Sequence, residues 1–357
     1  MTPAPRDLDL RHARVALVLN GAAGKKNARA QEVPIRDRLA PQVASFACYP
    51  SSKGSDIPAA ALRAVQDGAD LVLALGGDGT QSAVAGAVAG TRAVMGVLPG
   101  GTFNYFAREL GVGDTVEAAI TTLLSGQVRA LHVGEVNGRI FLNNASFGVY
   151  PAILERREAI YRRWGRSRIA AYWSVLMTLR DMRDPMHLSL TVNGVRRDMH
   201  TPLAFAARSA FQLDSLGLDG ADAVRDGQVA LFLAKGHTPR HLMAAAFRLA
   251  FGRVAHGQDF ELVLADDILI ETHKRQRLLA FDGEKQRMTG PFRLRVLRDA
   301  LSVIVPAPVF ASDSAPTPEP GSTPTSAPTS APAPTPDPEP KPGSDRTSGP
   351  DPAAQAG

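Results

Sequence analysis

The chain of 357 residues contains a single cysteine, Cys48. An intrachain disulfide and a zinc site built from cysteines are therefore excluded, which fits a reducing compartment. No run of about 18 apolar residues occurs, so we expect no segment to span a membrane. The N-terminal residues carry acids and arginines where a secretory signal needs an apolar stretch. These absences predict a cytoplasmic protein.

Large apolar residues are almost absent from residues 306–357, which consist mainly of Pro, Ser, Thr, Ala, Gly and acids. Such a segment cannot offset its conformational entropy, so we predict a disordered, partly polyproline tail. From Ser312 onward it holds six acids and two bases, which leaves a net charge of +9 for the rest of a chain whose total is +5. That excess suits a nucleotide, a membrane surface or a nucleic acid, although a solvated basic surface would look the same.

Short apolar runs alternate with longer amphipathic ones between Arg14 and Gly101. We predict strands over 14–21, 44–50, 70–77 and 93–101 and helices over 27–41, 56–68 and 80–90. Strands that are apolar throughout and separated by helices indicate a parallel sheet covered on both faces. Ligands bind such a sheet at the carboxyl ends of its strands.

The pattern changes after Val133 to short alternating strands around Asn-Gly and Asp-Gly pairs, which is typical of antiparallel hairpins. We therefore predict an α/β domain over residues 1–133 and a β-rich antiparallel domain over 134–305. The strand near 290–306 is expected to return to the first domain. Two helical stretches, 152–182 and 238–253, interrupt the second.

The stretch Gly76-Gly77-Asp78-Gly79-Thr80 follows a buried strand and opens a helix. Glycines allow close approach of the backbone to a ligand, and a helix N-terminus favours a phosphate. Asp78 could hold a magnesium ion or orient the loop, and Thr80 could contact a phosphate or cap the helix. The loop is therefore interpreted as a phosphate cradle.

Two other strand ends carry similar loops, at residues 20–25 and 99–104. Three such loops at the ends of parallel strands would lie on one rim. None of them has the spacing of a Walker A motif or of a Rossmann fingerprint. The first loop by itself would be interpreted as a tight turn.

The ordered set of motifs resembles the diacylglycerol kinase catalytic-domain family, the lipid kinases that include bacterial diacylglycerol kinases and sphingosine and ceramide kinases. The matching segments are Asn20–Gly24, GGDGT at 76–80, LPGGTFNYFAREL at 98–110, NNASFG at 143–148, VRDGQVALFLAKG at 224–236 and FDGE at 281–284. The resemblance covers about residues 14–306.

This resemblance implies an α/β nucleotide-binding domain with an NAD-kinase-like parallel sheet, followed by an antiparallel β-rich domain. It implies ATP and Mg²⁺ as cofactors, with Glu284 as catalytic base, Asp78 as a second catalytic residue and Asp226 as the ligand of a structural metal. The implied ATP-binding residues are Asn20, Gly21, Gly24, Ser51, Gly76, Gly77, Asp78, Gly79, Thr80, Gln81, Ser82 and Thr102.

Two departures from the family pattern concern the acceptor and the first loop. Tyr105 stands where the family has an aspartate, and the loop after Asn20 lacks the family's proline. From the residues alone, Asp226-Gly227 and Asp282-Gly283 would both be interpreted as hairpin turns.

The sequence thus predicts an ATP-dependent lipid kinase acting on an acceptor such as diacylglycerol. Other acceptors, a sphingoid base, a polyprenol or a soluble alcohol, remain open, as does a nucleotide-binding regulator without turnover. The helical stretch 152–182 is rich in arginine and holds both tryptophans, so it could rest on the inner face of a membrane, pack on the second domain, or do both with different faces. We expect no nucleic-acid partner and leave a homodimer open.

Overall fold

The computed structural model describes residues 8–20, 27–151, 185–236 and 259–308, together with residues 238, 241 and 244. Residues 309–357 of the predicted tail and the predicted helix at 152–182 lie outside these residues, as does most of the helix at 238–253. Across the part of the chain that the structure describes, none of the helices combines the length and apolarity that a bilayer crossing requires.

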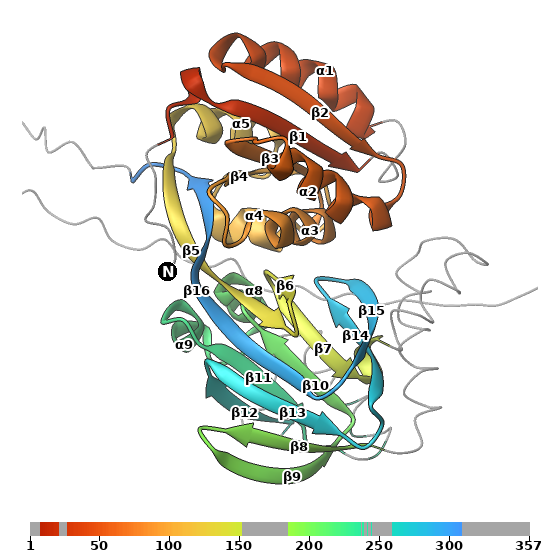
Figure 1. The fold of residues 1–357 in the computed structure, drawn as a ribbon. Helices are drawn as coiled ribbons and strands as arrows, with labels where there is room; N and C mark the ends of the chain where they lie inside the picture. The colour runs from red at the N-terminus through yellow and green to blue at the C-terminus, as the bar shows by residue number, and fades with distance from the viewer. Residues whose placement is uncertain are drawn as a thin grey trace, which may run out of the picture. The chain divides into compact units, whose positions relative to one another are not determined.

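The first half of the chain forms a parallel sheet with strand order β2-β1-β3-β4 (Figure 1). Its strands are β1 (Arg14–Asn20), β2 (Ser45–Ser51), β3 (Leu71–Gly76) and β4 (Val94–Pro99). The helices are α1 (Asn27–Leu39), α2 (Ile57–Gln66), α3 (Asp78–Val88), α4 (Tyr105–Leu110) and α5 (Val116–Ser125), with 3-10 turns η1 (Leu10–His12), η2 (Ala40–Gln42) and η3 (Gly54–Asp56). Every residue of β3 and β4 is buried, so the predicted α/β order is confirmed.

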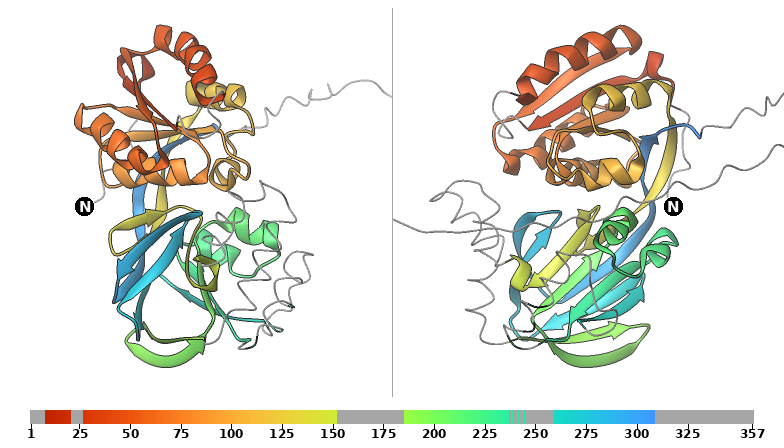
Figure 2. Two further views of the ribbon diagram at one scale, coloured as in Figure 1. Left: turned by 90° about the vertical axis from the view of Figure 1, so that its right-hand side faces the viewer. Right: turned by 180° about the vertical axis from the view of Figure 1, so that it is seen from behind.

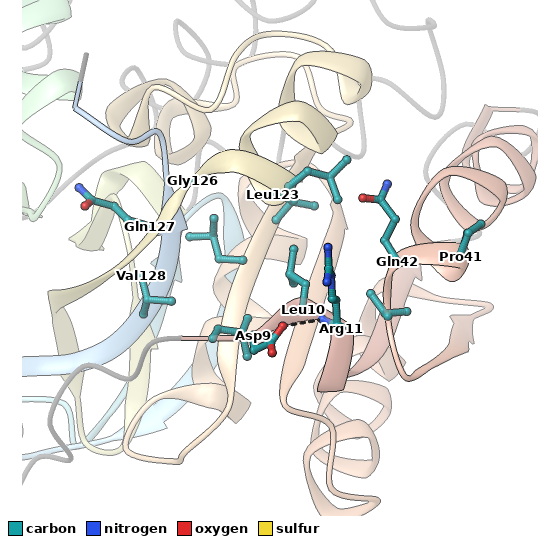
Figure 3. A pocket seen from close by; sticks show the side chains of 13 residues that line it. Asp9, Leu10, Arg11, Pro41, Gln42, Leu123, Gly126, Gln127 and Val128 are labelled. Atoms are coloured by element: carbon teal, nitrogen blue, oxygen red, sulfur yellow. Dashed lines mark hydrogen bonds between the residues drawn. The ribbon is translucent and has the colours of Figure 1, made fainter. Parts of the chain in front are cut away.

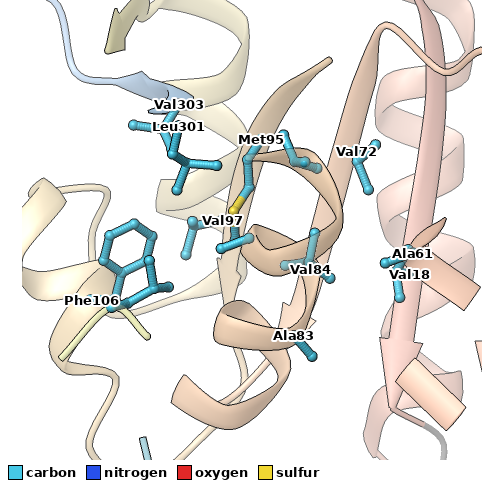
Figure 4. Packing of buried hydrophobic residues seen from close by; sticks show 14 of the residues in the cluster. Val18, Ala61, Val72, Ala83, Val84, Met95, Val97, Phe106, Leu301 and Val303 are labelled. Carbon is cyan, nitrogen blue, oxygen red and sulfur yellow. The ribbon is translucent and has the colours of Figure 1, made fainter. Parts of the chain in front are cut away.

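Helices cover both faces of this sheet because successive strand residues point to opposite sides. One face packs Val72 and Met95 against Ala61 of α2 and Val84 of α3 (Figure 4). The other face belongs to a separate core with residues of α1 and α5. The uninterrupted apolar strands of the sequence follow from this burial on both sides.

The second half is rich in antiparallel strands, as predicted. Its elements are β5 (Gln127–Val136), β6 (Arg139–Phe141), β7 (Asn144–Gly148), β8 (Met186–Val192), β9 (Val195–Thr201), β10 (Leu203–Ala207), α8 (Ala210–Leu216), α9 (Ala221–Arg225), β11 (Val229–Ala234), β12 (Phe260–Ala265), β13 (Asp267–Thr272), β14 (Gln276–Phe281), β15 (Glu284–Thr289) and β16 (Phe292–Val305). Six strands form an antiparallel sheet in the order β12-β11-β10-β7-β14-β15. Its apolar face packs against β8, β13 and β16.

Strand β16 links the two halves (Figures 1 and 2). Near its C-terminal end β16 pairs in parallel with β4, where Val303 lies opposite Met95. Its first residues pair antiparallel with β13, and β5 accompanies it along most of its length. The parallel sheet therefore continues into the second half as one ten-stranded sheet. The domain boundary near residue 133 stays a prediction.

Asn-Gly and Asp-Gly pairs form turns at three hairpins. Asn137-Gly138, Asn193-Gly194 and Asp282-Gly283 each have two positive φ angles, as a two-residue hairpin turn requires. The same interpretation is wrong for Asp226-Gly227. Asp226 is the C-cap of α9, and Gly227 leads from that helix into β11.

Candidate active site

The four parallel strands end at one edge of the sheet. Asn20 lies opposite Ser51, and Gly76 lies opposite Pro99. The Ser51 hydroxyl donates to the carbonyl of Lys53, so this side chain is engaged within its own turn. Thr102 is exposed in the loop after β4. The loops therefore share a rim, while the predicted ligands Gly21 and Gly24 lie outside the described residues.

The glycines of two loops pack against each other. The Gly100 amide donates to the carbonyl of Gly76 at 3.0 Å. A Cβ on Gly101 would lie 2.5 Å from the Cα of Gly77, and one on Gly100 would lie 3.1 Å from the Cα of Gly76. None of these four residues has a positive φ. Small size, rather than left-handed backbone, is therefore what the two loops require here.

Helix α3 begins at Asp78, two residues before the predicted start, and Gly77 is its N-cap. Thr80 is thus not the cap. Thr80, Gln81 and Ser82 are buried, and the Gln81 amide donates to the carbonyl of Gly76 at 3.0 Å. Their side chains support the loop, so a phosphate at this helix would meet the backbone N–H groups of the first turn.

Asp78 is held by two groups from different parts of the chain. Its Oδ1 accepts the N–H of Phe106, at the start of α4, at 3.2 Å and the amide of Asn143 at 3.1 Å. Asn143 is 1% exposed and lies between β6 and β7. Oδ2 of Asp78 has no hydrogen-bond partner within the described ranges. That oxygen is suited to bind a hydrated cation.

Asp282 organises the segment that carries Asn143. The buried carboxylate accepts N–H groups from Leu142 at 2.8 Å, Asn143 at 2.8 Å and Asn144 at 2.9 Å. Burial raises the pKa of Asp282, and these hydrogen bonds act in the opposite direction. Asp282 also forms the turn between β14 and β15, so one side chain fixes both the turn and the segment before β7.

The same turn brings Glu284 next to the first turn of α3. A Cβ on Gly79 would lie 3.1 Å from Oε1 of Glu284, so a side chain at this position would be in tight contact with the carboxylate. Glu284 is exposed, as a group that exchanges a proton must be at some stage. The structure thus brings Asp78, Gly79 and Glu284 together, while their catalytic and binding roles stay predictions.

A cavity of about 380 Å³ extends from Asp78 into the second half of the chain. Its polar end is formed by Asp78, Asn143, Asn144, Gln212, Asp282 and Gly283. Its apolar wall consists of Phe103, Tyr105, Tyr150, Leu203, Phe205, Leu216, Leu218, Phe232 and Phe260. The ring of Tyr105 stacks on that of Phe103 with centroids 5.7 Å apart. The residue that replaces the family's aspartate therefore belongs to the apolar wall.

Asp226 lies apart from these loops, exposed at the C-terminal end of α9. A Cβ on the adjacent Gly227 would lie 3.0 Å from Arg298 Nη1 and from the ring of His132. Within the described ranges, no three side chains of His, Cys, Asp or Glu gather as a metal site. A metal at Asp226 would take its other ligands from carbonyl groups and water. This assignment stays a prediction.

Another cavity, about 790 Å³, lies at the amino ends of β1 and β2 (Figure 3). Asp9, Arg11, Gln42, Leu123 and Gln127 are among its lining residues. The Arg11 N–H donates to Asp9 at 3.0 Å. No predicted site residue lines this cavity, and its location at the edge opposite the glycine loops separates it from the candidate site.

Asn143, Asp282 and the aromatic wall are the parts of the site that the motifs did not assign. Asn143 and Asp282 lie within segments that match the family, but the motifs gave neither residue a role. Asp282 followed by glycine is by itself typical of a turn. The aromatic residues come from segments far apart in sequence, so no spacing rule joins them. Only the packing of β7, β10 and β14 next to one another brings these groups together.

Comparisons with known proteins agree with this arrangement. Residues 14–136 match the family model of the diacylglycerol kinase catalytic domain. A diacylglycerol kinase of Staphylococcus aureus is 28% identical over 137 residues, which cover 38% of this chain and 44% of that protein. One of Staphylococcus saprophyticus is also 28% identical, covering 38% and 45%. Less than half of each relative's length is thus aligned.

The fold extends the likeness over most of the chain. A diacylglycerol kinase structure from Bacillus anthracis matches with a TM-score of 0.60 and 22% identity, covering 82% of this chain and 97% of that one. A second structure from the same organism gives a TM-score of 0.65 with 21% identity and coverages of 83% and 96%. The predicted fold class is confirmed. So is the resemblance to the diacylglycerol kinase catalytic-domain family, in sequence over residues 14–136 and in fold over most of the chain.

Proposed function

We propose that the protein is an ATP-dependent lipid kinase that transfers a γ-phosphoryl group to the hydroxyl of a lipid such as diacylglycerol. The observation that carries the proposal is the cavity whose polar end contains Asp78 and whose wall is aromatic. A lipid alcohol is likewise polar at one end, where it carries the hydroxyl, and apolar along its hydrocarbon chain. Apolar burial of the hydrocarbon would hold the hydroxyl near Asp78 and Glu284.

Phosphoryl transfer asks a protein mainly for positioning and for neutralisation of charge. The backbone around Gly77 and the first turn of α3 would bind the phosphates of ATP. Glu284 would take the proton from the acceptor hydroxyl. The hydroxyl oxygen would bond to the γ-phosphorus as the bond between the γ-phosphorus and ADP breaks. Mg²⁺, bound with ATP near Asp78, would neutralise charge on the phosphates.

A lipid acceptor requires the protein to visit a membrane surface. Phe103, at the rim of the cavity, is 60% exposed and stacks on Tyr105. An exposed aromatic side chain beside an apolar cavity suits the interface between water and lipid. We propose a cytoplasmic protein that contacts the inner face of the membrane peripherally at this point.

The proposal is tested by transfer of labelled γ-phosphate from Mg-ATP to total bacterial lipids in mixed micelles. Asp78→Asn is the control, because it should abolish transfer while the melting temperature stays within a few degrees of wild type. We expect one labelled lipid that disappears with the variant, and its chromatographic identity names the acceptor. An unchanged rate in Asp78→Asn contradicts the assigned site.

Other acceptors give distinct outcomes in the same assay. A labelled sphingoid base or polyprenol changes the acceptor and leaves the site as proposed. Absence of any labelled lipid, with ATP binding still measurable by calorimetry, favours a soluble alcohol or a nucleotide-binding regulator.

A further inference from the structure

A third cavity, about 270 Å³, is lined by Phe106 of α4, whose backbone N–H donates to Asp78. It is lined by residues of α4, β5 and α9 and by Arg208, which follows β10. The charged or titratable groups in its lining are Glu109, Arg129, His132, Arg208 and Arg225. None of them takes part in the proposed phosphoryl transfer.

Arg208 is a buried cation with no carboxylate at ion-pair distance, although Glu109 acts on it electrostatically from farther away. Its side chain is 8% exposed, and Nη1 donates to the carbonyl of Val224 at 2.8 Å. Nε is buried without a hydrogen-bond partner, and among the described residues no carboxylate forms an ion pair with this guanidinium. Burying an uncompensated charge is costly, so the surroundings of Arg208 favour an anion.

The carboxylate in the cavity is already engaged. Glu109 accepts the hydroxyl of Ser209 and the N–H of Ala210, so its oxygens are held by these donors and not by the guanidinium; burial raises its pKa, and the charge of Arg208 acts in the opposite direction. Arg225 is likewise occupied, because it pairs with Asp222 at 2.7 Å and with Asp214.

Two donors remain on β5. Arg129 is exposed and has no hydrogen-bond or ion-pair partner in the described ranges. The Nδ1 atom of His132 accepts the N–H of Asp299 at 2.9 Å, which assigns the proton of the neutral ring to Nε2. The cavity thus has one buried cation, one free cation and one ring donor.

We propose that this cavity binds a phosphate dianion, either free phosphate or a phosphate monoester, held by Arg208 and Arg129 with His132 as a further donor. Guanidinium groups bind phosphate through paired N–H donors, and an anion here would compensate the buried charge of Arg208. Arg129 and Arg225 are exposed, so the anion can enter from solvent between them. Free phosphate and the headgroup of a phosphorylated lipid share this chemistry.

The site is connected to Asp78 by two short paths. The Arg208 N–H donates to the carbonyl of Asn143 at 2.7 Å, and the Asn143 amide donates to Asp78. Helix α4 lines the cavity through Phe106, whose N–H also donates to Asp78. An anion that orders Arg208 and α4 would therefore stabilise the observed position of Asp78.

Calorimetry with inorganic phosphate on the full chain at constant ionic strength tests the site. We expect one equivalent bound by wild type and about tenfold weaker binding by Arg129→Gln, since one charge-assisted contact is lost. Arg208→Lys, which keeps the charge without the paired donors, should also bind more weakly. Arg92→Gln removes an exposed arginine outside the cavity and should bind like wild type. Thermal melts establish that each variant is folded.

Equal phosphate binding by wild type, Arg129→Gln and Arg208→Lys overturns the proposal and assigns phosphate to another place, such as the glycine loops. Equal weakening by Arg92→Gln also overturns it, because net charge alone would then explain binding. No phosphate binding by wild type overturns it unless the vesicle assay shows a loss specific to Arg129→Gln.

Sedimentation with phosphatidylcholine vesicles, with and without phosphatidic acid, distinguishes the two sources. If phosphatidic acid increases binding of wild type and of Arg92→Gln but not of Arg129→Gln, the ligand is the lipid headgroup. If vesicle binding is the same in all three while phosphate binding depends on Arg129, the ligand is free phosphate. Each of these results supports the site.

Discussion

The side-chain amide of Asn143 donates a hydrogen bond to Oδ1 of Asp78 at 3.1 Å, across 65 positions of sequence. Asn143 is itself fixed, because its backbone N–H is bound by the buried carboxylate of Asp282 at 2.8 Å. The carboxylate in the glycine loop is thus positioned from the second half of the chain.

Asn143→Ala should lower kcat about tenfold, because Asp78 loses the donor that fixes its carboxylate. The free energy of unfolding should fall by about 1 kcal/mol for one buried hydrogen bond. Steady-state kinetics and denaturant unfolding measure the two effects. Thr201→Val is the matched control, since it removes a buried hydroxyl that donates to Ala234 at 2.9 Å and does not contact Asp78. Equal losses of rate in both variants would assign Asn143 a purely structural role.

Glu284→Gln should lower kcat about 100-fold or more and leave ATP affinity near that of wild type, because the amide cannot accept the acceptor's proton. Single-turnover kinetics and calorimetry with ATP separate the two effects. Glu117→Gln changes an exposed glutamate on α5 and should leave both unchanged. A loss of ATP affinity as large as the loss of rate would show that Glu284 supports the loop around Gly79 instead.

Asp282→Asn should lower the free energy of unfolding by about 2–3 kcal/mol. Three N–H donors share two carboxylate oxygens at this position, and an amide offers one oxygen and a competing donor. Urea unfolding at constant m-value measures the loss. Asp222→Asn, at an exposed site, should change stability by less than about 0.5 kcal/mol. A wild-type midpoint for Asp282→Asn would show that the turn holds its conformation without the carboxylate.

Phe103→Ser should reduce phosphorylation of a lipid presented in vesicles without changing ATP affinity. Its side chain is 60% exposed beside the apolar cavity, so the substitution removes contact area with lipid and little internal packing. Val195→Ser, at another exposed apolar position, serves as control because Val195 does not line the cavity. Equal activity of Phe103→Ser and wild type on vesicles would place the membrane contact elsewhere.

His132 should make the fold less stable as pH falls. Its side chain is 25% exposed; burial lowers its pKa below 6.5, the charges of Arg208 and Arg298 act in the same direction, and Asp299 acts against them. Because its pKa is lowered in the folded state, the neutral His132 ring is the form that the fold favours. Its contribution to stability is therefore present above pH 6.5 and is lost as pH falls through the folded-state pKa. His132→Gln should therefore flatten the dependence of unfolding free energy on pH below 6.5.

Urea unfolding at a series of pH values measures this dependence. His273→Gln, at an exposed position, should retain the slope of wild type. Identical slopes for wild type and His132→Gln would show that other groups produce the pH dependence. Phosphate bound in the 270 Å³ cavity beside His132 would change the result, so the series is recorded in a buffer without phosphate.

The parallel sheet could be predicted closely because its signals are local. Residues 71–76 are apolar throughout, and the glycines at 76 and 77 end that run, so the strand and the loop are both evident without tertiary information. The start of α3 was predicted two residues late, since Gly77 serves as N-cap without a side-chain hydrogen bond. The Asp226-Gly227 pair by itself indicates a hairpin turn, because the short helix α9 before it has too few residues to show a helical period.

The sequence by itself determined the alternation of strands and helices, the glycine loops at the strand ends and the set of motifs that carries the family resemblance. These features depend on neighbours within a few positions, where sterics and burial act directly. The tertiary structure alone decided that Asn143 and Asp282 position Asp78, and that Nε of Arg208 is buried without a hydrogen-bond partner. Those relationships join residues far apart in sequence, and only packing of the strands that carry them brings the partners within hydrogen-bond distance.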